Sequence, residues 1–149
     1  MLTENDKAPA WSGEDQNGTN VDSTSLLGKR YLLYFYPKDD TPGCTAEACG
    51  FRDAFLSLSP KVTIFGVSAD TTASHATFIS KYALPFTLLA DTTKKIIGAF
   101  GANGTDFPKR VTFLIGARGT IEKIYSGFDC AKHASVLEKD LAILEAESV

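Results

Sequence analysis

The stretch that decides the fold runs from a hydrophobic segment into a helical pattern. It reads Tyr31-Leu32-Leu33-Tyr34-Phe35-Tyr36-Pro37-Lys38-Asp39-Asp40-Thr41-Pro42-Gly43-Cys44-Thr45-Ala46-Glu47-Ala48-Cys49. Its first six residues form a continuous run of aromatic residues and leucines, which is typical of a strand that is buried on both faces. Thr41 followed by Pro42 is typical of a helix N-cap with proline at the first helical position. The stretch therefore predicts a buried strand, a short loop and a helix.

Three further runs predict strands. Residues 62–68 and 111–115 are short and continuous, as in buried strands, and residues 120–125 follow a turn at 117–119. That spacing predicts an antiparallel hairpin between the last two runs. Amphipathic patterns predict helices over residues 45–58, 74–82, 93–100 and about 131–146. The order of elements predicts an α/β fold of the thioredoxin-like type, with helices on both faces of a mixed central sheet.

Length and composition describe an ordinary globular chain. Its 149 residues suit one compact domain, which we expect to span residues 1–149. A content of 44% hydrophobic and 22% charged residues excludes disordered and coiled-coil classes. The net charge is −3 and the chain has no basic run, so we expect neither nucleic acid nor an anionic membrane as a partner. The predicted substrate is a small molecule.

Cysteine usage and the amino terminus bear on the cellular compartment. Three cysteines are too few for a secreted disulfide framework, which favours a reducing environment. The first seven residues contain two acids and no apolar stretch, so no signal peptide is predicted. No window approaches the ~18 consecutive apolar residues that a membrane span needs. We therefore expect a cytoplasmic protein.

Cys44 is the residue with the clearest chemical role. The predicted N-cap places it in the first turn of a helix, where unpaired amides and the helix dipole stabilise a thiolate. Gly43 allows another group to approach the backbone closely. The alternative is that Cys44 is a small buried hydrophobic residue and that Thr41, Pro42 and Gly43 form only a cap.

The position of Cys49, five residues after Cys44, restricts any disulfide between the two. In an intact helix their Cα atoms would stand roughly 8–9 Å apart. A disulfide usually needs Cα atoms within about 7 Å. The pair therefore cannot close while the helix is intact, and Gly50 weakens the turn that must open. We expect a redox cycle that includes local unfolding.

The same residues resemble a known family. Pro37, Thr41 and Cys44 have the spacing of the active-site signature of the peroxiredoxins. Cys44 and Cys49, with the following residues 50–53, resemble the subgroup called peroxiredoxin Q or bacterioferritin comigratory protein. The resemblance covers nearly the whole chain. It includes the opening segment from Ala8-Pro9 to Gly18, and also Gly66-Val67-Ser68, Phe86-Thr87-Leu88-Leu89-Ala90-Asp91 and Arg110-Val111-Thr112-Phe113-Leu114-Ile115.

The resemblance implies a thiol-dependent peroxidase of the atypical 2-Cys type, with no metal or organic cofactor. Cys44 would reduce hydrogen peroxide or an organic hydroperoxide and become a sulfenic acid. Cys49 would then condense with it to form an intramolecular disulfide. Thioredoxin or a similar dithiol protein would reduce that disulfide. The resemblance further implies a monomer.

The resemblance also implies the residues of the pocket. Thr41 and Arg110 would donate hydrogen bonds to the leaving oxygen, together with the amides of Gly43 and Cys44. Pro37 would shield the thiolate from water. Glu47 would hold Arg110, although a solvated helix carboxylate is nearly as good an interpretation.

Cys130 and the two histidines lie outside this pattern. Asp129 could cap the last helix and leave Cys130 in its first turn, with an acidified thiol. Other peroxiredoxin groups resolve with a cysteine near the carboxyl terminus, on tails longer than this one. We therefore expect Cys49 to resolve and Cys130 to be a bystander. His75 is expected to be exposed in the first turn of a helix.

Two other functions use the same cysteines. A thiol–disulfide oxidoreductase shares the predicted fold, but it normally needs a Cys-x-x-Cys motif, which this chain lacks. A zinc- or redox-sensing module would bind a metal through Cys44, Cys49, Cys130 and His133. The gap between the first two cysteines lies at the wide limit of zinc-ligand spacing, so zinc is the weaker interpretation.

Overall fold

A computed structural model describes residues 2–147, and its central feature is a mixed seven-stranded sheet. The strands are β1 (Ser12–Glu14), β2 (Asn20–Asp22), β3 (Tyr31–Phe35), β4 (Thr63–Ser68), β5 (Thr87–Ala90), β6 (Val111–Ile115) and β7 (Ile121–Ser126). Their order across the sheet is β2-β1-β5-β4-β3-β6-β7. Strands β3, β4 and β5 are parallel, whereas β6 is antiparallel to both β3 and β7. The predicted β6–β7 hairpin is confirmed.

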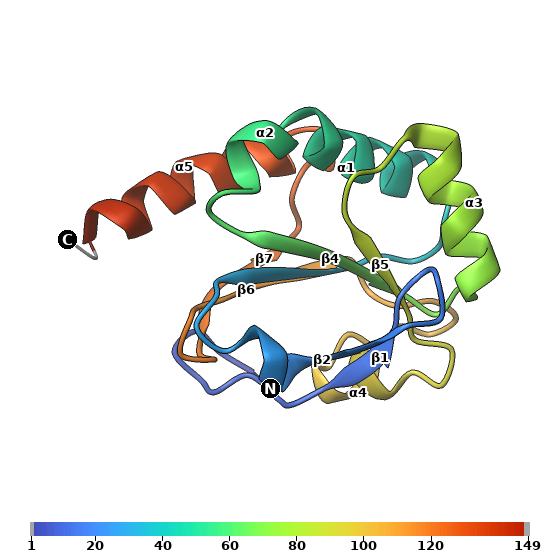
Figure 1. The fold of residues 1–149 in the computed structure, drawn as a ribbon, viewed down its shortest axis with the longest axis horizontal. Coiled ribbons are helices and arrows are strands. Elements are labelled where there is room, and N and C mark those ends of the chain that lie inside the picture. The colour runs from blue at the N-terminus through green and yellow to red at the C-terminus, as the bar shows by residue number, and fades with distance from the viewer. Residues whose placement is uncertain (1, 148–149) are drawn as a thin grey trace.

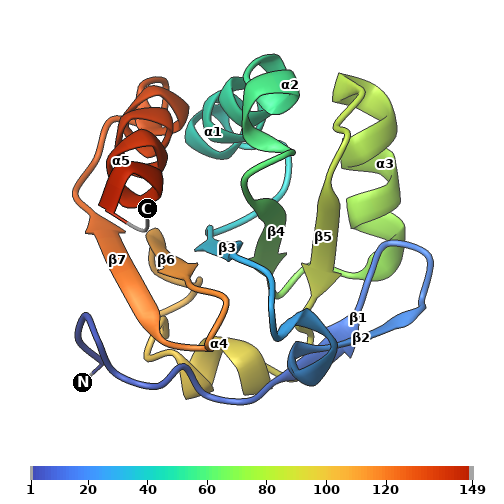
Figure 2. The same cartoon turned by 60° about the vertical axis from the view of Figure 1, so that its left-hand side comes forward.

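Helices cover both faces of the sheet, as predicted. They are α1 (Pro42–Asp53), α2 (Phe55–Leu58), α3 (Thr72–Tyr82), α4 (Lys95–Ala99) and α5 (His133–Glu147), with a 3₁₀ helix, η1, at Ser23–Leu26. Figure 1 shows α1 and α3 above the sheet and α4 below it. Figure 2 shows α5, α1 and α3 side by side on that upper face. None of the helices within residues 2–147 is long and apolar enough to cross a membrane.

The central strand β3 has a hydrophobic core on each side. Side chains alternate between the faces of a strand, so Leu32 and Tyr34 face the core under α1, α3 and α5. Leu33 and Phe35 face the second core, which packs against α4. All four residues are buried. This two-sided burial explains why β3 is a continuous apolar run, and it fixes where the loop after β3 leaves the sheet.

The structure corrects some predicted boundaries. The helix predicted over residues 45–58 begins three residues earlier, at Pro42, and is interrupted at Ala54, where φ is −94° and ψ is 4°. Three strands were not predicted. β1 and β2 have three residues each and β5 has four, which is too short for a periodic pattern to distinguish them from loops.

Candidate active site

Cys44 lies where the loop after β3 enters α1. It is the third residue of that helix and is almost fully buried, with 1% of its surface exposed. Thr41 is the N-cap and Pro42 is the first helical residue, as predicted. The thiol therefore lies at the amino end of α1, where the helix dipole favours a negative charge.

The side chain of Thr41 does not cap the helix. Its hydroxyl donates a hydrogen bond to the carbonyl oxygen of Lys38 at 2.8 Å, and it makes no bond to an amide of α1. The first-turn amides therefore do not have the Thr41 hydroxyl as an acceptor, although the Thr45 amide donates to the Thr41 carbonyl oxygen at 2.8 Å. With its hydrogen directed at Lys38, the hydroxyl has only its lone pairs left for another partner. Donation from Thr41 to the leaving oxygen requires the hydroxyl to rotate away from Lys38.

Arg110 joins the cysteine to a buried carboxylate. It immediately precedes β6, and its Nη2 donates to Cys44 Sγ at 3.1 Å. Its Nη1 donates to Glu47 Oε1 at 2.8 Å. A guanidinium keeps its charge at all working pH values, so it stabilises a thiolate and offers donors to an oxygen that develops negative charge. The structure thus brings together Cys44, Arg110 and Glu47.

Gly43 makes room for this approach. A Cβ atom built on Gly43 would lie 3.1 Å from Arg110 Nη2 and 3.8 Å from Cys130 Sγ. The missing side chain therefore lets the guanidinium and a second thiol lie against the first turn of α1. Pro37 follows β3 at the start of the loop and is half-buried. Its shielding of the thiolate stays a prediction.

Glu47 is buried rather than solvated, which excludes the alternative interpretation of this residue. The pKa of its carboxyl group is raised to about 8, because burial disfavours the charged form more than Arg110 favours it. Oε1 accepts from Arg110, whereas Oε2 has no hydrogen-bond partner within residues 2–147. Oε2 lies 3.9 Å from His133 Nε2.

His133 belongs to this site although the sequence indicated it only as a zinc ligand. It begins α5, is buried, and its Nε2 lies 3.0 Å from Thr112 Oγ1 on β6. Its ring stacks on Phe128 with centroids 3.9 Å apart. Burial and the nearby Arg110 charge lower the pKa of His133 to about 4, so the ring is neutral at neutral pH. The position of His133 depends on packing between α5 and β6, so no local sequence pattern predicts it.

The raised pKa of Glu47 predicts a pH-dependent stability. Between its ordinary value of 4.5 and about 8, the folded state holds a proton that the unfolded state has lost. Stability therefore falls as pH rises through this range, by up to about 1.4 kcal/mol per pH unit. His133, with its lowered pKa, has the opposite effect only below 6.5. We expect the free energy of unfolding to fall between pH 6.5 and 8 in urea titrations.

The matched control for this prediction is Glu47→Gln, which keeps the shape of the side chain and cannot ionise. The decline between pH 6.5 and 8 should be clearly smaller in that variant. Equal slopes in the two proteins would show that Glu47 ionises normally in the folded state.

The two other cysteines have different settings. Cys49 is half-buried within α1, and that helix is continuous from Pro42 to Asp53, so the argument that unwinding must precede a Cys44–Cys49 disulfide applies to the structure. All three cysteines are free thiols here. Cys130 was predicted to lie in the first turn of the last helix. In the structure it lies three residues before α5 begins, so this prediction is wrong. Burial raises the pKa of its thiol, so the predicted acidification is also wrong.

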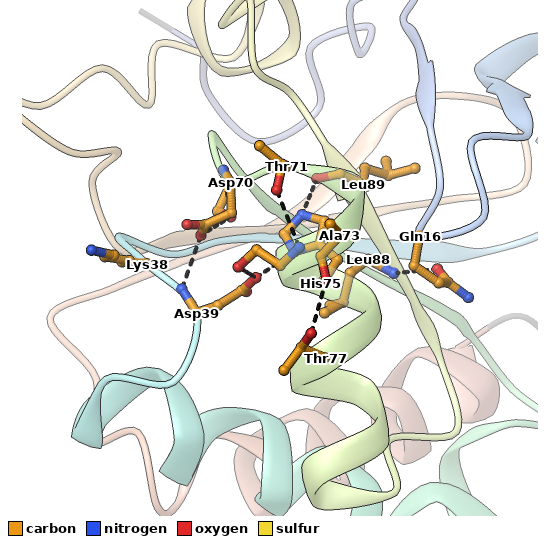
Figure 3. Close-up of polar contacts among 12 residues, drawn as sticks. Gln16, Lys38, Asp39, Asp70, Thr71, Ala73, His75, Thr77, Leu88 and Leu89 are labelled. Carbon is orange, nitrogen blue, oxygen red and sulfur yellow. Dashed lines mark hydrogen bonds and ion pairs between the residues drawn. The ribbon is translucent and has the colours of Figure 1, made fainter.

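A buried polar network anchors the loop before Cys44 (Figure 3). Asp39 Oδ2 lies 2.7 Å from Nδ1 of His75 and accepts from the Ser74 hydroxyl at 2.8 Å. Its Oδ1 accepts from the Tyr36 hydroxyl at 2.6 Å, and its amide donates to Asp70 at 2.9 Å. His75 is fully buried, so the prediction of an exposed residue is wrong. The network ties the loop to α3 and to the end of β4.

The hydrogen bonds of His75 fix the position of its protons. Its Nε2 lies 2.9 Å from the carbonyl oxygen of Leu89, which can only accept, so Nε2 carries a hydrogen. The 2.7 Å contact between Nδ1 and Asp39 then requires a second proton between ring and carboxylate. Both ring nitrogens of His75 are therefore in hydrogen bonds, and both oxygens of the Asp39 carboxylate also have partners.

Two groups of residues contain possible metal ligands. Asp39, Asp70 and His75 offer ligand atoms that all lie within 4.8 Å of one another, but both nitrogens of His75 are already in hydrogen bonds. Within residues 2–147, the four residues of the zinc alternative do not gather into a group of ligands. These residues are Cys44, Cys49, Cys130 and His133.

Arg110 also lines an open hollow. The hollow measures about 720 Å³ and is lined mainly by apolar residues of β6, β7 and the C-terminal end of α4, among them Val111, Ile124 and the α4 C-cap Phe100. Arg110 is the residue that this hollow shares with the Cys44 site.

Comparison with known proteins agrees with this geometry. The profile of the AhpC/TSA family matches residues 5–124. The chain belongs to the AhpC/TSA family. A putative peroxiredoxin bcp of Coxiella burnetii is 42% identical over 128 residues, which are 80% of this chain and 85% of that protein. The resemblance to peroxiredoxins of the Q or bacterioferritin comigratory type is therefore confirmed.

Two further relatives extend the comparison. Chloroplastic peroxiredoxin Q of Gentiana triflora is 40% identical over 130 residues, and the matched part is 84% of this peroxiredoxin but only 60% of the plant protein. A solved structure of the bacterioferritin comigratory protein of Xanthomonas campestris, presented with its alkyl peroxide reduction activity, has a TM-score of 0.84 and 27% identity. The matched part is 89% of this chain and 90% of the Xanthomonas chain. The thioredoxin-like fold is thereby confirmed.

Proposed function

We propose that this peroxiredoxin is a thiol-dependent peroxidase in which Cys44 reduces hydrogen peroxide and small organic hydroperoxides. The observation that carries the proposal is the contact between Arg110 Nη2 and Cys44 Sγ, 3.1 Å apart at the amino end of α1. It places a permanent cation and unpaired amides around one buried sulfur. The apolar hollow beside Arg110 suits the organic part of a hydroperoxide.

The chemical step uses the residues described above. The thiolate of Cys44 attacks one peroxide oxygen, the S–O bond forms, and the O–O bond breaks. The leaving oxygen gains negative charge and takes a proton from the solution as water or an alcohol departs. Arg110 stabilises the thiolate before the attack and the leaving oxygen during it. We assign the amides of Gly43 and Cys44, in the first turn of α1, as further donors to this oxygen.

The second half of the cycle restores the thiol. In our proposal Cys49 condenses with the Cys44 sulfenic acid after part of α1 unwinds, and the resulting disulfide is reduced by thioredoxin or a similar dithiol protein. We further propose that the protein acts as a monomer in the cytoplasm. The low number of cysteines, which suits a reducing compartment, supports the location, and the relation to peroxiredoxin Q supports the reductant.

The experiment that tests this function is peroxide consumption by the purified protein with a thioredoxin system. Cys44→Ser should abolish turnover, because serine has no thiolate and cannot form a sulfenic acid. The matched control is Cys130→Ser, which should retain turnover through Cys49. Normal turnover by Cys44→Ser would refute the assignment. Insulin reduction by the wild-type protein without peroxide would instead favour a thiol–disulfide oxidoreductase.

A further inference from the structure

Cys130 is far from Cys44 in sequence but lies at the same site. Its Sγ would be 3.8 Å from a Cβ atom built on Gly43, the residue directly before Cys44. The same Cβ position is 3.1 Å from Arg110 Nη2, the atom that donates to Cys44 Sγ. Two thiols and one guanidinium therefore meet at the first turn of α1. The expectation that Cys130 is a bystander does not account for this arrangement.

We propose that Cys130 is a second resolving thiol, which condenses with the sulfenic acid of Cys44 in the same chain. The proposal rests on the peroxidase function proposed above. In this step the sulfur of Cys130 attacks the sulfur of Cys44, the S–S bond forms, and the S–O bond of the sulfenic acid breaks. The departing hydroxyl and the thiol proton of Cys130 leave as water. No further oxidant or reductant is needed, because the peroxide has already oxidised Cys44.

The charges around Cys130 change in its favour when Cys44 is oxidised. Burial raises the pKa of the Cys130 thiol, Arg110 lowers it, and Glu47 and Cys44, when ionised, raise it further. A sulfenic acid is neutral, so the contribution of the Cys44 thiolate disappears after reaction with peroxide, whereas Arg110 remains. A larger fraction of Cys130 is therefore present as the thiolate, which is the nucleophilic form, once Cys44 has become a sulfenic acid.

The two resolving routes require different movements. Cys49 can reach Cys44 only if hydrogen bonds of α1 are broken, because both residues are inside that helix. Cys130 lies in the segment between Ser126, the end of β7, and His133, the start of α5. That segment is neither helix nor strand, and it contains Gly127 at a φ of 63°. A shift of this loop toward Cys44 would leave α1 folded.

The test uses the Cys49→Ser variant, in which Cys130 is the only remaining partner for Cys44. The reduced protein is treated with one equivalent of hydrogen peroxide, and its disulfides are mapped by mass spectrometry of non-reduced peptides. We expect a Cys44–Cys130 disulfide within one chain and the loss of both free thiols. In Cys49→Ser/Cys130→Ser, the sulfenic acid should persist and be trapped by dimedone at Cys44.

The outcomes separate this proposal from the peroxidase function. Equal dimedone trapping in the single and double variants, with the Cys130 thiol retained, would overturn the resolving role while leaving the peroxidase intact. A Cys44–Cys130 link found only between chains would also overturn it. If neither variant forms a sulfenic acid at Cys44, the peroxidase function itself fails. Cys130→Ala replaces Cys130→Ser if the serine variant lacks a cooperative unfolding transition.

Discussion

Replacing Arg110 with methionine should lower the second-order rate constant for hydrogen peroxide by about 10²–10³-fold, the usual effect of removing one preorganised donor to a developing anion. Methionine keeps much of the length of the side chain but loses the charge and both hydrogen bonds, to Cys44 and to Glu47. The thiolate and the leaving oxygen would both lose their nearest cation. The measurement is the loss of peroxide in a single turnover, with Cys44 in excess.

The adjacent residue provides the control for this variant. Lys109 is exposed and carries the same charge, one position before Arg110. Lys109→Met should leave the rate constant within a factor of about two, because a solvent-exposed charge is strongly screened. If both variants reacted at the wild-type rate, the guanidinium would have no part in the chemical step.

Replacing His75 with leucine should destabilise the protein by about 3–5 kcal/mol, the range found when one partner of a buried ion pair is removed. The change leaves the Asp39 carboxylate buried and without its ring partner, and it leaves the Leu89 carbonyl oxygen without the ring N–H. Equilibrium unfolding in urea, followed by circular dichroism, measures the loss.

Thr77→Ala is the matched control on the same helix. The Thr77 hydroxyl donates only to the Ala73 carbonyl, and the residue is exposed (Figure 3). Its replacement should change stability by less than about 0.5 kcal/mol. A loss in His75→Leu as small as in Thr77→Ala would mean that the Asp39–His75 contact does not hold the active-site loop.

The sequence was sufficient where local chemistry determines structure. The run from Tyr31 to Tyr36 predicted a central strand because both faces of β3 are covered, and Thr41 with Pro42 predicted the first turn of α1. The spacing of Cys44 and Cys49 predicted that an intact helix separates them. Each of these predictions depends on neighbours in the chain, which a single sequence records.

Features that depend on distant packing could not be predicted in this way. Cys130 reaches the site only because the loop before α5 passes Gly43, and His75 is buried only because α3 packs against the loop that carries Asp39. The sequence indicated His133 only as a metal ligand, although its ring lies 3.9 Å from the buried carboxyl group of Glu47. The placement of Arg110 came from the family resemblance, since an arginine before a strand is usually a solvated charge.

The central claim is that Cys44 attacks the peroxide and that Cys49 resolves the product. Its most direct test is a thiol and disulfide map of the wild-type protein after reaction with one equivalent of hydrogen peroxide. Cys44 should be lost as a free thiol, and its major disulfide partner should be Cys49 of the same chain. Recovery of Cys44 as an unmodified thiol, after the peroxide has been consumed, would contradict it.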